Sequence, residues 1–115
     1  MQFIQGEELY DVIREIGLLS THDAQFYAAC IIMIIEYLWE NNVFLRDIKP
    51  ENFIVDMDGY PILIDLVSAK VYKEKTSRQK TFTMIGTPHY IAPEIIMNKG
   101  HTYYSSLYSL GINIY

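Results

Sequence analysis

The chain has 115 residues and a formal net charge of -5 at pH 7, and 50% of its residues are hydrophobic. This length allows one small domain with an apolar core. The acidic balance argues against nucleic acid or an anionic membrane as the main partner, because phosphate groups would be repelled, and it favours a basic peptide instead.

Two helices are predicted before residue 42. A stripe of apolar residues within residues 8–16 predicts a first helix, and Gly17 stands where a C-terminal cap is expected. Ser20 with Asp23 three residues later forms an imperfect capping box, which predicts a second helix that runs to about Asn41. Apolar positions continue nearly all round this second helix, so we expect it to be buried.

The same segment bears on the location of the protein. The apolar run at residues 26–35 is much shorter than the roughly 20 residues that cross a bilayer. Cys30 lies within it and is predicted to be a buried free thiol in a reducing compartment. The first residues have no basic flank and turn acidic at once, unlike a signal peptide. A cytoplasmic protein without a membrane span is therefore expected.

The next segment combines a base, a cation and a metal-binding amide in one tight loop. It reads Arg46-Asp47-Ile48-Lys49-Pro50-Glu51-Asn52. Asp47 can accept the proton of an attacking hydroxyl, Lys49 can neutralise charge on a transferring phosphoryl group, and Asn52 can hold a metal ion through its amide oxygen. Pro50 stiffens the turn that aims them. This set of residues indicates phosphoryl transfer.

A β-hairpin is predicted after this loop. Two β-rich runs, residues 53–56 and 60–64, flank Met57-Asp58-Gly59, and an Asp-Gly turn in that setting is a strong hairpin signal. The second run ends at Asp65, which the hairpin would lift opposite Asn52. Two oxygen ligands suit Mg²⁺.

The last part of the chain alternates between polar and apolar segments. Residues 68–83 are polar and loop-like, and they carry a local cluster of basic residues: Lys70, Lys73, Lys75, Arg78 and Lys80. A final apolar run at residues 103–115 predicts a helix.

Three motifs in this order resemble the eukaryotic protein kinase family. They are the loop at residues 46–52, Asp65-Leu66-Val67 in the place of the metal-binding Asp-Phe-Gly, and Gly86-Thr87-Pro88-His89-Tyr90-Ile91-Ala92-Pro93-Glu94, which resembles the end of an activation segment. Residues 6–14 and 94–101 are further similar to the cyclic-nucleotide-dependent serine/threonine kinases of the AGC group, and most like the cGMP-dependent kinases of protists.

This resemblance implies an α+β fold: a kinase-like C-terminal lobe, mainly helical with a small β-hairpin, and incomplete. Residues 1–115 would hold the hinge and this lobe through the start of the helix after the activation segment, with the N-terminal lobe absent. The Gly-x-Gly-x-x-Gly loop and the Val-Ala-Ile-Lys strand that cover and clamp the phosphates are not in the chain.

The resemblance also implies cofactors and site residues. The cofactors are ATP and Mg²⁺, and the partner is a protein substrate with basic residues near its serine or threonine. Catalytic roles fall on Asp47, Lys49 and Arg46, metal binding on Asn52 and Asp65, contacts to ATP on Gln2, Ile4, Glu8, Glu51 and Ile54, and activation-segment roles on Thr83, Thr87 and Glu94. In this scheme Arg46 pairs with a phosphorylated Thr83, Thr87 bonds Asp47 and Lys49, and the two glutamates contact the ribose or the basic substrate.

The chain departs from the family pattern at three places. Leu66-Val67 replaces Phe-Gly, so we expect Asp65 to be misaimed, because a β-branched residue resists a positive φ. Ser106 replaces the aspartate that holds the catalytic loop, which predicts a looser loop. Leu45 replaces a histidine or tyrosine and keeps an apolar packing role.

Three interpretations stay open at this point. The first is a serine/threonine kinase that phosphorylates basic proteins. The second, favoured for the isolated 115 residues, is a pseudokinase or regulatory fragment in which Leu66-Val67, Ser106 and the missing N-terminal lobe leave binding without turnover. A missing N-terminal lobe or a regulatory cyclic-nucleotide-binding region is a further candidate partner of the chain. The third is a truncated product that never folds stably, because its exposed apolar faces would invite aggregation.

Overall fold

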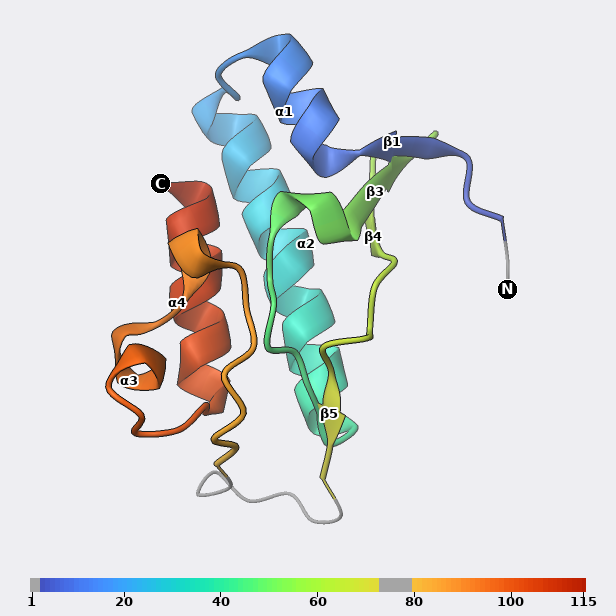
Figure 1. Ribbon diagram of the computed structural model, residues 1–115. Helices are drawn as coiled ribbons and strands as arrows, with labels where there is room; N and C mark the ends of the chain where they lie inside the picture. Colours follow the sequence, from blue (N-terminus) through green and yellow to red (C-terminus); the bar gives the residue numbers. More distant parts are fainter. Residues whose placement is uncertain (1–2, 73–79) are drawn as a thin grey trace.

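A computed structural model describes residues 3–72 and 80–115 as an assembly of helices with two small antiparallel sheets (Figure 1). The helices are α1 (Leu9–Ile16), α2 (Thr21–Glu40), α3 (Pro93–Ile96) and α4 (Tyr103–Ile114), with 3₁₀ turns η1 (Pro50–Asn52) and η2 (Pro88–Tyr90). The strands are β1 (Gly6–Glu8), β2 (Val43–Phe44), β3 (Phe53–Asp56), β4 (Pro61–Leu63) and β5 (Lys70–Val71). The predicted α+β class is confirmed.

The ends of the first two helices lie where the sequence predicts them. Gly17 follows α1 with φ 85°, and its N–H donates to the Ile13 carbonyl. Ser20 caps α2, because its hydroxyl oxygen accepts from the Asp23 N–H at 3.1 Å. These caps use backbone groups that a helix leaves unpaired at its ends.

The expectation that α2 is buried nearly all round is wrong. Its fully buried residues are Ile31 and Ile35, Cys30 is only half-buried, and several large apolar side chains are exposed: Phe26, Ile32, Met33 and Tyr37. The helix packs against β2, β4 and α4. Within the described residues these elements cover one side of a 20-residue helix, and the other side has no comparable cover.

The predicted hairpin is confirmed as β3 and β4, which pair from Phe53↔Leu63 to Val55↔Pro61. Gly59 takes φ 87° in its turn, and the Asp56 carboxylate accepts from the N–H groups of Asp58 and Tyr60. Strand β1 adds to β3 to complete a three-stranded sheet in the order β1-β3-β4. The second sheet, β2 with β5, was not predicted, since two-residue strands are too short to show alternation.

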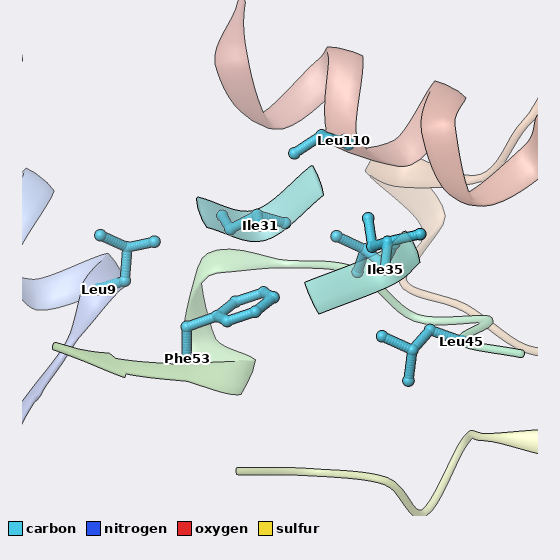
Figure 2. Close-up of a cluster of buried hydrophobic side chains, with 7 residues drawn as sticks. Leu9, Ile31, Ile35, Leu45, Phe53 and Leu110 are labelled. Carbon is cyan, nitrogen blue, oxygen red and sulfur yellow. The ribbon is translucent and has the colours of Figure 1, made fainter. Parts of the chain in front are cut away.

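One apolar cluster joins the helices to the segment after α2. It consists of Leu9, Ile31, Ile35, Leu45, Ile48, Phe53 and Leu110. Figure 2 shows all of these except Ile48 with labels, converging from α1, α2, α4 and the segment that leads into β3. Leu45 and Ile48 bracket residues 46 and 47, and each is at most 4% exposed. The core therefore fixes both ends of the short stretch that carries Arg46 and Asp47.

The polar segment at residues 68–83 is described only in part. Lys73, Lys75 and Arg78 lie outside the described residues, whereas Lys70 begins β5 and Thr81 forms an antiparallel bridge with His101. None of the helices described has the length and apolar character needed to cross a membrane.

Candidate active site

The Asp47 carboxylate lies at the centre of a group of hydrogen bonds contributed by two separate segments. Its Oδ1 accepts from the Thr87 backbone N–H at 2.8 Å and from the Thr87 hydroxyl at 2.9 Å. Its Oδ2 lies 3.0 Å from Lys49 Nζ, and the same Nζ donates to Thr87 Oγ1 at 3.1 Å. The three side chains thus form a closed triangle, which holds the carboxylate in one orientation.

These contacts set the charge state of both ionisable groups. Burial alone would raise the pKa of Asp47, but the hydrogen bonds from Lys49 and Thr87 outweigh it and leave the pKa below its ordinary value. The hydrogen bond with Asp47 raises the pKa of Lys49. Asp47 is therefore ionised and Lys49 is protonated at neutral pH, which are the states that proton acceptance and phosphoryl neutralisation require.

Gly86 allows Thr87 to reach the loop. Its φ is 135°, a conformation that L side chains rarely adopt, and a Cβ added there would lie 3.3 Å from the Arg46 carbonyl oxygen. Glycine lets the backbone at residue 86 pass close to residue 46, which places the Thr87 N–H against Asp47.

Asn52 and Asp65, the two predicted metal ligands, lie beside each other. Asn52 is 5% exposed, and its amide nitrogen donates to the Asp47 carbonyl at 2.9 Å, a bond that does not use the amide oxygen. The Ile64 N–H donates to the Asn52 carbonyl at 3.0 Å, so the chain places Asp65 next to Asn52. Among the described residues no three His, Cys, Asp or Glu gather around a metal position, but an amide oxygen and a carboxylate fit Mg²⁺.

The Asp65 carboxylate has one local partner, the Val67 N–H, at 2.8 Å. Val67 is not among the described non-glycine residues with a positive φ, and its side chain is 93% exposed. The Leu66-Val67 substitution thus leaves Asp65 in a short Asx-type turn.

Arg46 and two of the residues predicted for the activation segment, Thr83 and Glu94, make contacts away from the Asp47 carboxylate. Arg46 donates through Nε to the Ser68 carbonyl at 2.6 Å. Thr83 is exposed, with its hydroxyl 3.5 Å from that of Thr81. Glu94 accepts from the Ser105 hydroxyl at 2.7 Å. Of the three residues assigned to the activation segment, only Thr87 reaches Asp47 in the part of the chain described.

The predicted ATP contacts that the structure describes lie in or before the three-stranded sheet and in η1. Glu8 and Ile54 are paired across β1 and β3, and Glu8 is exposed. Glu51 is half-buried in η1, and its Oε2 is buried without a hydrogen-bond partner in the described part of the chain. Ile4 lies in the irregular segment before β1. Gln2 lies outside the described residues.

Ser106 contacts the loop although it replaces the aspartate. Its hydroxyl donates to the Leu45 carbonyl at 2.6 Å, and Ser106 is 3% exposed. A serine thus anchors the backbone next to Arg46 as a donor, although it lacks the charge of an aspartate.

Two residues that the sequence analysis did not single out also touch this region. Asn113 donates through its amide to the Ile48 carbonyl at 3.1 Å. His101, which is 1% exposed, bonds through Nε2 to the Ile85 carbonyl at 3.2 Å, and burial lowers its pKa. Both bonds join positions distant in the chain, and no local pattern signals them.

The arrangement brings an ionised carboxylate, Asp47, and a cation, Lys49, together in one loop, and the Asn52 amide lies in the same loop. A hydroxyl placed at Asp47 would find a proton acceptor, and a phosphoryl group beside it would find the Lys49 ammonium. These are the requirements of phosphate transfer to an alcohol.

Comparison with known proteins points to the same chemistry. The sequence pattern of the family described as "Protein kinase domain" matches residues 1–115. The chain is 45% identical over 114 residues to a cGMP-dependent protein kinase of Eimeria tenella, and likewise to one of Toxoplasma gondii, in each case covering 99% of this chain and 11% of the relative. It is 42% identical over 110 residues to the human cGMP-dependent protein kinase 2, covering 96% of this chain and 14% of the relative.

Proposed function

Because the chain belongs to the protein kinase domain family, we propose that it supplies the catalytic loop and activation segment of a serine/threonine kinase. The reaction transfers the γ-phosphate of ATP to a hydroxyl group on a basic protein. The cGMP-dependent protein kinases that it resembles are members of this family.

The observation that carries the proposal is the fixed Asp47 carboxylate. Thr87 and Lys49 hold it through three contacts of 2.8 to 3.0 Å, and its pKa lies below the ordinary value. Asp47 accepts the proton of the substrate hydroxyl as the oxygen attacks. Lys49, already 3.1 Å from Thr87 Oγ1, stabilises charge on the phosphoryl group as it transfers.

ATP and Mg²⁺ are the cofactors of this proposal. Asn52 and Asp65 would hold the metal, which when bound neutralises charge on the phosphates. Their neighbouring positions, fixed by the Ile64 to Asn52 backbone bond, support this assignment. Ile54 would form the floor of the adenine pocket, and backbone groups of Ile4 and of Gln2, which lies outside the described residues, would face the base.

The preference for a basic substrate rests on charge. The chain has a formal net charge of -5, and Glu8 is exposed at the edge of the sheet. Lysine and arginine side chains next to the acceptor serine or threonine would be attracted to this side. A cytoplasmic location is part of the proposal, since ATP is supplied there.

The chain spans only a small part of the length of its relatives. The chain covers 11% to 14% of the length of the relatives named above. We assign residues 1–115 to the hinge and part of the C-terminal lobe. An N-terminal lobe and a cyclic-nucleotide-binding region are the partners that would complete the enzyme and regulate it.

The test uses the endogenous protein, tagged at its own gene and purified from its source cells. It is given radiolabelled ATP, Mg²⁺ and peptides that differ only in the acceptor (serine, threonine or tyrosine) and in the flanking charge (arginine or glutamate). We expect transfer to the serine and threonine peptides with arginine flanks. Transfer to tyrosine alone, or no transfer above a mock purification, would contradict the proposal.

A further inference from the structure

Helix α4 reaches the loop around Asp47 at two points through uncharged side chains. Ser106 donates to the Leu45 carbonyl at 2.6 Å, and Asn113 donates to the Ile48 carbonyl at 3.1 Å. Residues seven apart lie on the same face of a helix, two turns from each other. The two carbonyls that these donors hold lie on either side of Asp47.

Between the two donors, Leu110 inserts into the apolar core. It is 3% exposed, and Figure 2 shows it extending from α4 toward Ile31 of α2. The face of α4 that meets the loop therefore has a polar contact at each end and an apolar contact in the middle. The helix fixes the distance between the two donors, and the buried Leu110 side chain holds this face of α4 against the core.

Asn113 does more than stabilise its own helix. Its amide nitrogen also donates to the Ser109 carbonyl at 2.6 Å, while its Oδ1 is buried without a hydrogen-bond partner in the described part of the chain. A leucine here would avoid that unpaired oxygen. The side chain thus carries a local energetic cost, and the contact to Ile48 is what the asparagine adds over an apolar residue.

We propose that Asn113, acting with Ser106, is a positioning residue that holds the backbone on both sides of Asp47 and so keeps its carboxylate against Thr87. Asn113 does not touch the reacting groups and acts through the Ile48 carbonyl. The inference rests on the proposed kinase function for its effect on catalysis, but its effect on the Asp47 to Thr87 contact can be measured without catalysis.

The Thr87 backbone N–H is the reporter, because it donates to Asp47 Oδ1 at 2.8 Å. In the 115-residue chain, Asn113→Leu removes the donor to Ile48 together with the unpaired Oδ1, so we expect global stability to be kept. We expect hydrogen exchange of the Thr87 amide to become about tenfold faster or more. In the tagged endogenous protein, kcat for phosphate transfer should fall about tenfold or more with KM unchanged, because positioning acts on the reacting geometry.

Asn41→Asp is the matched control. Asn41 makes the same type of bond four residues back, from its Nδ2 to the Tyr37 carbonyl at 2.7 Å, at the end of α2. Asn113→Asp, which keeps the shape but replaces the donor by an acceptor, should speed Thr87 exchange, whereas Asn41→Asp should leave it unchanged. Asn113→Gln keeps the amide donors and should restore Thr87 protection at least in part.

The outcomes separate the two claims. Thr87 exchange within twofold of the unsubstituted chain in both Asn113→Leu and Asn113→Asp would overturn the positioning role, whatever the activity. If neither variant folds, hydrogen exchange of the Thr87 amide is measured in Ser106→Ala. Unchanged Thr87 exchange in that variant overturns the proposal that Ser106 and Asn113 together position Asp47. An unsubstituted protein that transfers no phosphate contradicts the proposed function, and the exchange measurement still decides the positioning role.

Discussion

Asp47 and Asp65 are both carboxylates of the candidate site, yet their surroundings differ. Asp47 is held by Thr87 and Lys49, and Thr87 comes from a segment 40 residues further along the chain. Asp65 has one local contact, to the N–H of Val67 two residues on. The carboxylate proposed to accept the proton is thus arranged by a tertiary contact, whereas the proposed metal ligand Asp65 lies in a short local turn.

This difference has a physical consequence for catalysis. A carboxylate fixed before the reaction needs little reorganisation in the transition state, which is the main source of electrostatic catalysis. A carboxylate in a local turn can move toward a metal ion when one binds, because the hydrogen bond that holds Asp65 in the described part of the chain is to a residue only two positions away.

The strongest test of the Asp47 side is Asp47→Asn in the tagged endogenous protein. The amide keeps the shape of the side chain but cannot accept a proton from the substrate, so kcat should fall about 10² to 10⁴-fold. The measurement is steady-state phosphate transfer to the basic serine peptide. Activity within threefold of the unsubstituted protein would show that Asp47 is not the proton acceptor.

The approach of the two segments is tested by Gly86→Ala. A positive φ of 135° and a Cβ 3.3 Å from the Arg46 carbonyl should together cost about 2 to 3 kcal/mol of unfolding free energy. Gly59→Ala is the control, because Gly59 also has a positive φ of 87° but no heavy atom within 4 Å of the added Cβ, so we expect about 1 kcal/mol. Urea unfolding measures both, and equal losses would mean that the close approach at residue 86 contributes nothing.

A pair of substitutions compares the two carboxylates directly. Thr87→Val removes the hydroxyl bond to Asp47 and should lower the unfolding free energy by about 1 kcal/mol, a value reduced for the partial exposure of Asp47. Asp65→Asn should change it by less than about 0.5 kcal/mol, because the amide oxygen can still accept from Val67. A larger loss for Asp65→Asn than for Thr87→Val in urea unfolding would reverse the comparison.

The smallest expected effect is a pH dependence. Because the pKa of Asp47 is lowered in the folded protein, its contribution to stability is complete above the unfolded value of about 3.9 and is lost as the pH falls through the folded value. The difference in unfolding free energy between the unsubstituted chain and Asp47→Asn should therefore shrink between pH 6 and pH 3. A difference that stays constant or grows toward low pH would contradict the lowered pKa.

The parts of the fold that the sequence predicts are those with local causes. The Gly17 cap, the Ser20 cap and the Asp58-Gly59 turn each act within a few residues, and the structure has all three. The sequence also places Asp47 and Lys49 in one tight loop, and the structure has them in contact at 3.0 Å.

The missed parts depend on contacts between distant residues. Ser106 contacts Leu45, 61 positions away, and Asn113 contacts Ile48, 65 positions away. No sequence pattern around either residue predicts which distant backbone group it will bind. The error at α2 has the same origin, because apolar content shows what a helix could bury but not which neighbours cover it.

The most direct test of the central claim is the pKa of the Asp47 carboxyl group, measured by ¹³C NMR titration of the 115-residue chain without nucleotide or metal. If Lys49 and Thr87 arrange this carboxylate in advance, its pKa lies below the ordinary aspartate value of about 3.9 and rises toward it in Thr87→Val. A pKa at or above 3.9 that Thr87→Val leaves unchanged would contradict the account.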